Sequence, residues 1–160
     1  MFTSDEVGAI MVGLALLRRS GDKGLQRAAQ GVKRKIADVL PREMLRSLDQ
    51  TALQVSSHGI TPPTLVDLSL LRAAIRAERK LLLVYKDSEG HQTRRTVLPL
   101  AVFYYVEIVV LAAWCELRRD FRHFRVDRIS ACSGLGEFFK TEAEALRAWW
   151  RDNVGNATPE

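Results

Sequence analysis

Five arginines lie within eleven residues, from position 118 to position 128, in the stretch CELRRDFRHFRVDRI. A guanidinium group is planar, stays charged and can hold a phosphate or a carboxylate through two parallel hydrogen bonds. So many like charges repel one another unless something neutralises them. Two more arginines, Arg94 and Arg95, belong to a predicted neighbouring hairpin. The sequence therefore predicts a shared anion site, although for any single arginine an ion pair or a solvated strand end is the stronger interpretation.

The alternation of side chains along a strand sorts the residues of this stretch. Successive side chains of a strand point to opposite faces, so Arg122, Phe124 and Arg128 would share one side while His123 and Arg125 would share the other. Aromatic residues among the predicted strands could stack the bases of a single-stranded nucleic acid. The rings are Tyr85, Tyr104, Tyr105 and Trp114. They could instead belong to the core, an interpretation that is stronger for Trp114 than for the adjacent Tyr104 and Tyr105, since only one of an adjacent pair can face inward.

Catalytic and metal-binding patterns are weak. The histidines His58, His91 and His123 lie far apart and lack the spacing of metal ligands. No phosphate-binding loop, no G-x-G-x-x-G and no G-x-S-x-G motif occurs. His123 could act as a general base beside Asp127 or Glu116, but a binding module without catalytic residues, metal or cofactor is favoured.

Composition is compatible with an anionic partner. The 160 residues carry a formal net charge of +5, and 18 of the 24 basic residues are arginine. No apolar run reaches the ~18 residues of a membrane span, and acids precede the apolar part of the N-terminus, unlike in a signal peptide. Only Cys115 and Cys132 are present, outside any C-x-x-C pair. We expect a soluble, cytoplasmic protein with reduced thiols.

The first 54 residues are predicted to be helical. Thr3 and Glu6 have the spacing of a capping box, and Asp22 is suited to cap a second helix after the break at Gly21. Pro41 can end that helix and begin a third. The apolar stripes of these short helices need a cover, which a homodimer would provide. We therefore predict a helical dimerisation segment over 1–54 and a linker over 55–64, VSSHGITPPT.

Residues 65–137 change to β-rich character after one helix that would run to about Lys80. LLLVYK, a DSEG turn and HQTRRTVLPL indicate a hairpin, and AVFYYV and IVVLAAWC are read as two further strands. A fifth strand would span 121–129, and Gly134 and Gly136 would end the pattern. Residues 138–160 would form a helix, with a capping box at Thr141 and Glu144, and a frayed tail. The fold class is α+β, with a small antiparallel barrel or strongly bent sheet.

The β-rich part resembles the WYL domain found in bacterial transcriptional regulators. The resemblance rests on R-x-V-x-P-L at 95–100, on F-R-x-D-R-I at 124–129 and on the order of the elements around them, and residues 1–54 resemble the helical segment that precedes this domain. Two features depart from the family. The Trp-Tyr-Leu triplet is replaced by Val109, Val110 and Leu111. The usual winged helix-turn-helix is absent, since Met1 falls where the connecting segment would begin.

This resemblance implies an Sm-like or SH3-like β-barrel that binds a nucleotide, a single-stranded nucleic acid or another anionic effector. Operator DNA would then be bound only through the absent winged helix-turn-helix. Three arginines match basic positions of the family motifs, and their neighbours would line the same groove. The predicted ligand-binding residues are Arg95, Arg118, Arg122, His123, Arg125, Arg128, Tyr85 and Tyr105.

The predicted function is thus the effector-sensing, non-enzymatic and homodimeric part of a transcriptional regulator. One alternative is a nucleotide- or RNA-processing enzyme that uses His123. Another is a purely structural dimerisation module whose arginines are paired internally.

Overall fold

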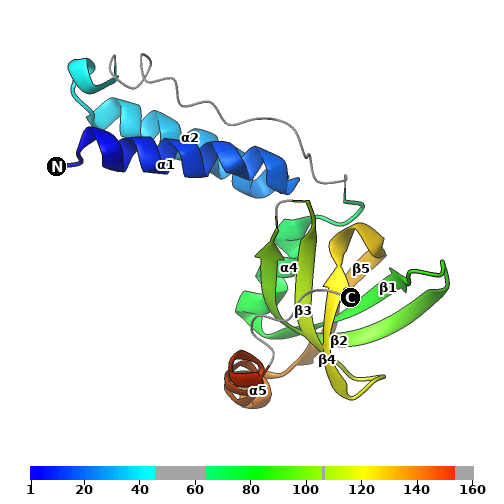
Figure 1. The fold of residues 1–160 in the computed structure, drawn as a ribbon. Coiled ribbons are helices and arrows are strands. Elements are labelled where there is room, and N and C mark those ends of the chain that lie inside the picture. Colours follow the sequence, from blue (N-terminus) through cyan, green and yellow to red (C-terminus); the bar gives the residue numbers. More distant parts are fainter. Residues whose placement is uncertain (46–63, 106, 154–160) are drawn as a thin grey trace. The chain divides into compact units, whose positions relative to one another are not determined.

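The computed structural model describes residues 1–45, 64–105 and 107–153. The chain divides into two compact units, Met1–Ile60 and Thr61–Glu160. Among the described residues, Figure 1 shows helices in the first unit and a sheet with helices in the second. No helix within the described residues is long and apolar enough to cross a membrane.

In the described part of the first unit, helices α1 and α2 have ends that follow from local sequence. Helix α1, Ser4–Leu16, begins with the predicted capping box: Thr3 Oγ1 accepts from the backbone N–H of Glu6 at 3.3 Å, and Glu6 Oε2 accepts from the Thr3 N–H at 2.7 Å. A 3₁₀ turn, η1 (Leu17–Ser20), leads to Gly21 at φ 68°, a conformation that glycine adopts without strain. Helix α2, Lys23–Val39, is capped by Asp22 as predicted. The predicted Leu48 of a third helix lies outside the described residues.

The second unit opens with helix α4, Leu68–Ala77, whose N-cap is Asp67. The helix ends earlier than predicted, because Glu78 takes up a left-handed conformation at φ 54° and reverses the chain. Strand β1 begins at the next residue. Arg147 of the last helix donates to Glu78 Oε1 at 2.9 Å and so fixes this corner.

Five antiparallel strands form one sheet in the order β4-β3-β2-β1-β5. A 3₁₀ turn, η2 (Val126–Arg128), joins β4 to β5. The α+β class is confirmed. The strands are β1 (Arg79–Lys86), β2 (Gln92–Tyr104), β3 (Val109–Cys115), β4 (Asp120–Arg125) and β5 (Ile129–Phe138).

The predicted barrel is not closed. Strands β4 and β5 form the two edges of the sheet, and no pairing joins them within the described residues. The strand prediction around Pro99 was also wrong, because the two segments separated there belong to one strand, β2. Its pairing with β3 shifts between Pro99 and Ala101. Proline cannot donate to the ladder and sits at such a bulge, which bends a strand without ending it.

Strand β5 was missed, and the predicted strand over 121–129 ends at Arg125. Gly134 and Gly136 were expected to break the pattern, yet both lie within β5. The Arg79 guanidinium covers Gly134 and donates to the carbonyls of Gly134 and Leu135 where the β1–β5 register shifts. Gly134 therefore lies in a strand at a position where a side chain approaches the backbone closely. Sequence alone does not distinguish such a glycine from one in a turn.

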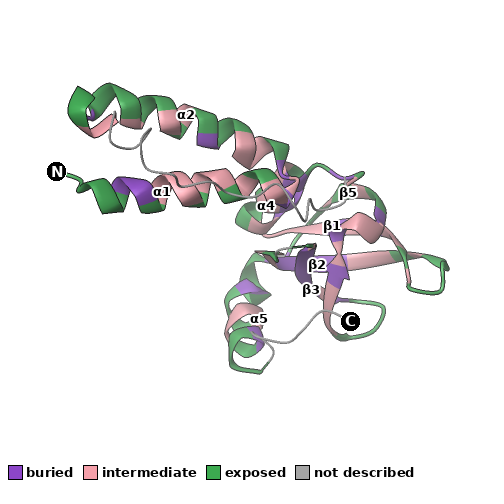
Figure 2. Cartoon of the chain, turned by 45° about the horizontal axis from the view of Figure 1, so that its top comes forward, coloured by how far each residue is buried: buried purple, intermediate pink, exposed green. Residues whose placement is uncertain are grey.

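The two faces of the sheet belong to different apolar clusters, and buried residues concentrate on the central strands (Figure 2). On one face, Leu71 of α4 packs with the inward residues of all five strands, among them Leu83 and Leu111. On the other face, helix α5 (Lys140–Asn153) places Trp150 against the cluster of Leu100 and Phe139. Helix α5 begins at Lys140, so Thr141 lies inside the first turn rather than before it.

Candidate functional site

The α4-side face of the sheet changes from apolar to charged toward one end. On this face of β2, the buried Val97 lies next to Arg95, two residues earlier in the chain. On the same face of β4, Phe124 lies next to Arg122 in the same way. Tyr85 ends the corresponding row of β1, where its ring meets that of Phe124 edge-on at 5.1 Å. The hydrophobic core thus gives way to guanidinium groups at the end of the sheet where Arg95, Arg122 and Tyr85 lie.

A cavity of about 280 Å³ occupies this end. We call it the arginine cavity. Its walls come from β1, β2, β4, η2, the end of β3 and the turns between β1 and β2 and between β3 and β4. It is lined by Tyr85, Asp87, Ser88, Arg95, Cys115, Arg118, Arg122, His123, Phe124 and Arg128.

The charges of the arginine cavity are unbalanced, since four guanidinium groups face one carboxylate. Arg122 has Asp120 at 3.8 Å, a long ion pair at the edge strand. Arg118 and Arg128 make no ion pair within residues 1–45, 64–105 and 107–153. The cavity therefore has the electrostatic character that favours an anionic ligand.

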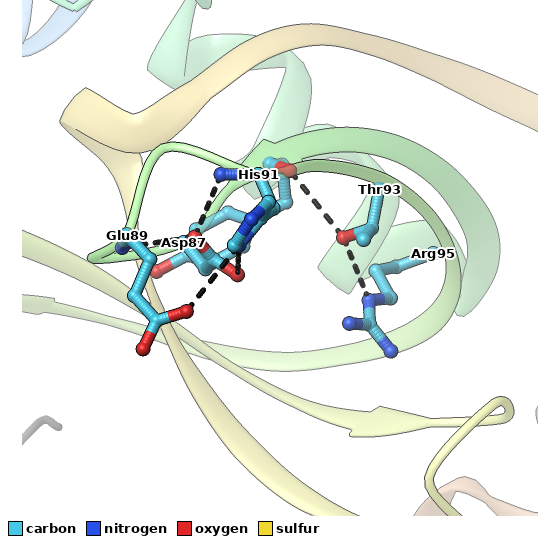
Figure 3. Close-up of polar contacts among 6 residues, drawn as sticks. Asp87, Glu89, His91, Thr93 and Arg95 are labelled. Carbon is cyan, nitrogen blue, oxygen red and sulfur yellow. Dashed lines mark hydrogen bonds and ion pairs between the residues drawn. The ribbon is translucent and has the colours of Figure 1, made fainter.

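Arg95 is held in place from one side only. Its Nε donates to Thr93 Oγ1 at 3.1 Å, and the Thr93 hydroxyl in turn donates to the carbonyl of Tyr85 at 3.4 Å (Figure 3). Its Nη1 is buried and has no acceptor among the described residues. A buried N–H group without a partner is unfavourable by about 1–3 kcal/mol, so an oxygen of a bound ligand would stabilise this arginine.

The β1–β2 turn forms another wall through Asp87. Its Oδ1 accepts from the backbone N–H groups of His91 at 2.8 Å and Glu89 at 3.0 Å (Figure 3). These bonds lower the pKa of Asp87, the one from His91 most. The carboxylate is therefore charged at neutral pH, but it serves first to hold the turn.

Two of the eight predicted residues lie outside the arginine cavity. Arg125 donates from both Nε and Nη2 to Asp127, at 3.1 and 2.8 Å. This pairing lowers the pKa of Asp127 and raises that of Arg125. Tyr105 lies beside the ring of Phe103, with the ring centroids 6.2 Å apart. The structure thus brings together six predicted residues and places these two elsewhere.

His123 lines the cavity, but its ring lies on the α5 side of the sheet. Its centroid is 6.5 Å from that of Phe103 and 6.2 Å from that of Trp150, in edge-on contacts. This position agrees with the predicted alternation along β4. Within the described residues, no group of three His, Cys, Asp or Glu side chains could hold a metal ion.

Four lining residues were not predicted. Cys115 and Phe124 follow from the strand register, because Cys115 pairs with Val97 and Phe124 with Leu111, both in the core. An alternation count on β3 and β4 could have found them. Asp87 and Ser88 belong to the turn after β1, and only the three-dimensional path of the hairpin brings them to the cavity.

Comparison with known proteins now adds to this geometry. Residues 67–133 match the WYL domain. Proteasome accessory factor B/C (PafBC) of Arthrobacter aurescens is among the solved structures similar to this chain, with 25% sequence identity and a TM-score of 0.48. The alignment covers 89% of this chain and 22% of PafBC, so the chain spans less than a quarter of that protein. No curated protein sequence matches the chain significantly.

The matched range begins at the N-cap of α4 and ends within β5, and it includes every residue that lines the arginine cavity. The resemblance drawn from the two motifs is therefore confirmed. The chain contains a WYL domain, formed by residues 67–133.

Proposed function

We propose that the WYL domain binds an anionic effector in the arginine cavity and that the chain is the effector-sensing part of a transcriptional regulator. The effector would be a nucleotide, a single-stranded nucleic acid or a related anion. The observation that carries this proposal is the convergence of four arginines from β2, β4, η2 and the β3–β4 turn on one cavity. The regulatory role rests on the WYL match.

Three properties of the cavity support an anion. Guanidinium groups hold phosphate oxygens in a bidentate fashion, and Arg95 has a buried N–H group without an acceptor among the described residues. The volume of about 280 Å³ approaches the lower end of small-molecule sites, ~300 Å³. Tyr85 adds an aromatic ring to the wall, where a base or sugar could pack.

Binding of a fluorescent single-stranded oligonucleotide across a salt series tests the proposal, with a mononucleotide as competitor. Arg95→Ala should weaken binding strongly, and log Kd should change linearly with log salt, because each phosphate contact releases counterions. Arg94→Ala is the matched control, since Arg94 is an exposed neighbour on the opposite face of β2 and its replacement changes the net charge equally.

The expected result is a loss of affinity in Arg95→Ala and little change in Arg94→Ala, both in folded protein. Equal weakening by the two variants would mean that only the overall charge matters. If the unmodified chain binds neither oligonucleotide, mononucleotide nor inorganic pyrophosphate at low salt, the proposal is refuted.

We also propose that the N-terminal helices dimerise. Leu16, Val32 and Val39 of α1 and α2 are 40 to 73% exposed, and a helical hairpin of this size buries little apolar surface alone. Sedimentation equilibrium of the chain should give the mass of a dimer, and Val32→Glu should reduce it to that of a monomer. A monomer before the substitution would refute this arrangement.

A further inference from the structure

A second cavity adjoins the arginine cavity and shares part of its wall. Asp87, Ser88 and Arg128 line both. The second cavity has a volume of about 480 Å³ and is more open. We call it the turn cavity, because most of its wall is the β1–β2 turn. Its other lining residues are Leu65, Lys86, Glu89, Gly90, Asp127 and Ser130. Because Arg128 lines both cavities, a ligand that extends past it from the arginine cavity would reach the turn cavity.

The two cavities differ in charge. Four guanidinium groups and one carboxylate line the arginine cavity, whereas two cationic side chains and three carboxylates line the turn cavity. A phosphate is thus attracted to the first and finds no excess of positive charge in the second. Carboxylates accept hydrogen bonds and do not donate them when ionised, so the turn cavity suits the N–H groups of a ligand.

Glu89 is the carboxylate of the turn cavity with the most free acceptor capacity. Asp127 is engaged by both donors of Arg125, and Asp87 Oδ1 accepts two backbone N–H groups of the turn. Among the described residues, the polar contact of the Glu89 side chain is the one with His91 Nδ1, at 3.4 Å (Figure 3). Its side chain is 78% exposed. A donor on the ligand can therefore reach it without breaking an existing bond of the fold.

We propose that the effector is a nucleotide whose base carries an amino group. Its phosphate lies in the arginine cavity, its base extends past Arg128, and the base amino group donates a hydrogen bond to Glu89 in the turn cavity. This inference rests on the proposed function, since the arginine cavity must first hold the phosphate. It adds a class of base and a residue that selects it.

Three pairs of mononucleotides that differ by one amino group test the inference. They are GMP with IMP, AMP with purine riboside 5′-monophosphate, and CMP with zebularine 5′-monophosphate, measured by calorimetry on the full chain. At least one amino-bearing member should bind about fivefold more tightly than its partner, as expected for one hydrogen bond to a partly solvated carboxylate. In Glu89→Gln this preference should fall to about one, because the neutral amide is a weaker acceptor.

The loss of charge in Glu89→Gln and the loss of the proposed hydrogen bond act on binding in opposite directions, so this variant separates the two effects. Removal of one negative charge weakens the repulsion of every anion alike. Through charge alone, both members of a pair and inorganic pyrophosphate should therefore bind Glu89→Gln at least as tightly as they bind the unmodified chain. Only loss of a specific contact lowers the ratio within a pair. Glu142→Gln, an exposed position of α5 that lines neither cavity, carries the same charge change and should leave the ratio unchanged.

The outcomes separate the two proposals. If pyrophosphate binds and Arg95→Ala abolishes its binding, but no pair discriminates or the preference persists in Glu89→Gln, the anion site stands and the amino-base inference is wrong. If neither pyrophosphate nor any nucleotide binds the unmodified chain, the proposed function fails and the inference fails with it.

Discussion

At the scale of single residues, the face of the strand on which an arginine lies decides its environment. Arg122 and Arg125 are three residues apart on one strand, yet Arg122 lines the arginine cavity while Arg125 holds Asp127. The sequence indicated an anion site because arginines cluster there. It could not show whether Arg125 or Arg128 pairs with Asp127, because Asp127 is two residues from the first and one from the second. The conformation of the turn η2 decides which of the two arginines reaches the carboxylate.

The Arg125–Asp127 pair should contribute to stability in a way that depends on pH. The pKa of Asp127 is lowered in the folded state, so its contribution is present above the ordinary aspartate pKa of about 3.9 and is lost as the pH falls through the folded value. We expect Arg125→Ala to lower the free energy of unfolding by about 1 kcal/mol at pH 7.

Urea unfolding at a series of pH values from 7 downward checks this. The difference between Arg125→Ala and the unmodified chain should shrink below pH ~4, while Arg94→Ala should show little difference throughout. A constant difference at all pH values would assign the effect to lost packing rather than to the ion pair.

The thiol of Cys132 should be unreactive in the folded protein. Burial raises its pKa to about 11, so only about one thiol in a few thousand is ionised at pH 7.5, and the thiolate is the nucleophile. Alkylation by iodoacetamide, followed by mass spectrometry, should be slow at pH 7.5, faster as the pH approaches 11, and fast in urea. Rapid modification of the folded chain at pH 7.5 would contradict the raised pKa of this half-buried thiol.

At the scale of elements, the starts of α1 and α2 were predictable, whereas the start of α5 and the strand ends were not. The caps at Thr3 and Asp22 are made by side chains within three residues of their partners, so local sequence contains the information. The bulge of β2 at Pro99 and the continuation of β5 through Gly134 depend on neighbouring strands. Only the register with β3 and the position of Arg79 explain them.

Gly134 and Arg79 should therefore be energetically coupled. A Cβ at position 134 would lie 2.9 Å from Arg79 Cζ, so Gly134→Ala must displace the guanidinium from the carbonyls that it binds. We expect a loss of about 1 kcal/mol in stability, the value of a typical hydrogen bond. In the Arg79→Ala background the same substitution should have little effect.

A double-mutant cycle with four unfolding curves measures this coupling. Additive effects of the two substitutions would show that the guanidinium moves aside without loss. Gly136→Ala is the control, since a Cβ there meets nothing within 4 Å in the described part of the chain.

At the scale of the whole molecule, the two units differ in how much core they hold. The second unit contains both apolar clusters and every residue of the arginine cavity. The first unit buries few large apolar side chains among its described residues, chiefly Val7 and Leu40. The sequence predicted the change from helical to β-rich character, but not that the sheet would stay open at β4 and β5, which depends on pairing between distant strands.

A fragment of residues 61–160 should accordingly fold alone and keep the oligonucleotide affinity of the full chain. Circular dichroism and the salt-series binding assay check this, with Arg95→Ala in the fragment as the negative control. A folded fragment that has lost affinity would show that the first unit contributes to the site.

The floor of the arginine cavity is also the end of the hydrophobic core, where Tyr85 and Phe124 meet. An occupant therefore binds the folded chain and not the unfolded one, and at 100 times its Kd it would add about 2.7 kcal/mol to the free energy of unfolding. The melting temperature thus becomes a label-free readout. A library of cellular anions can be ranked by thermal shift before any chemical identity is assumed.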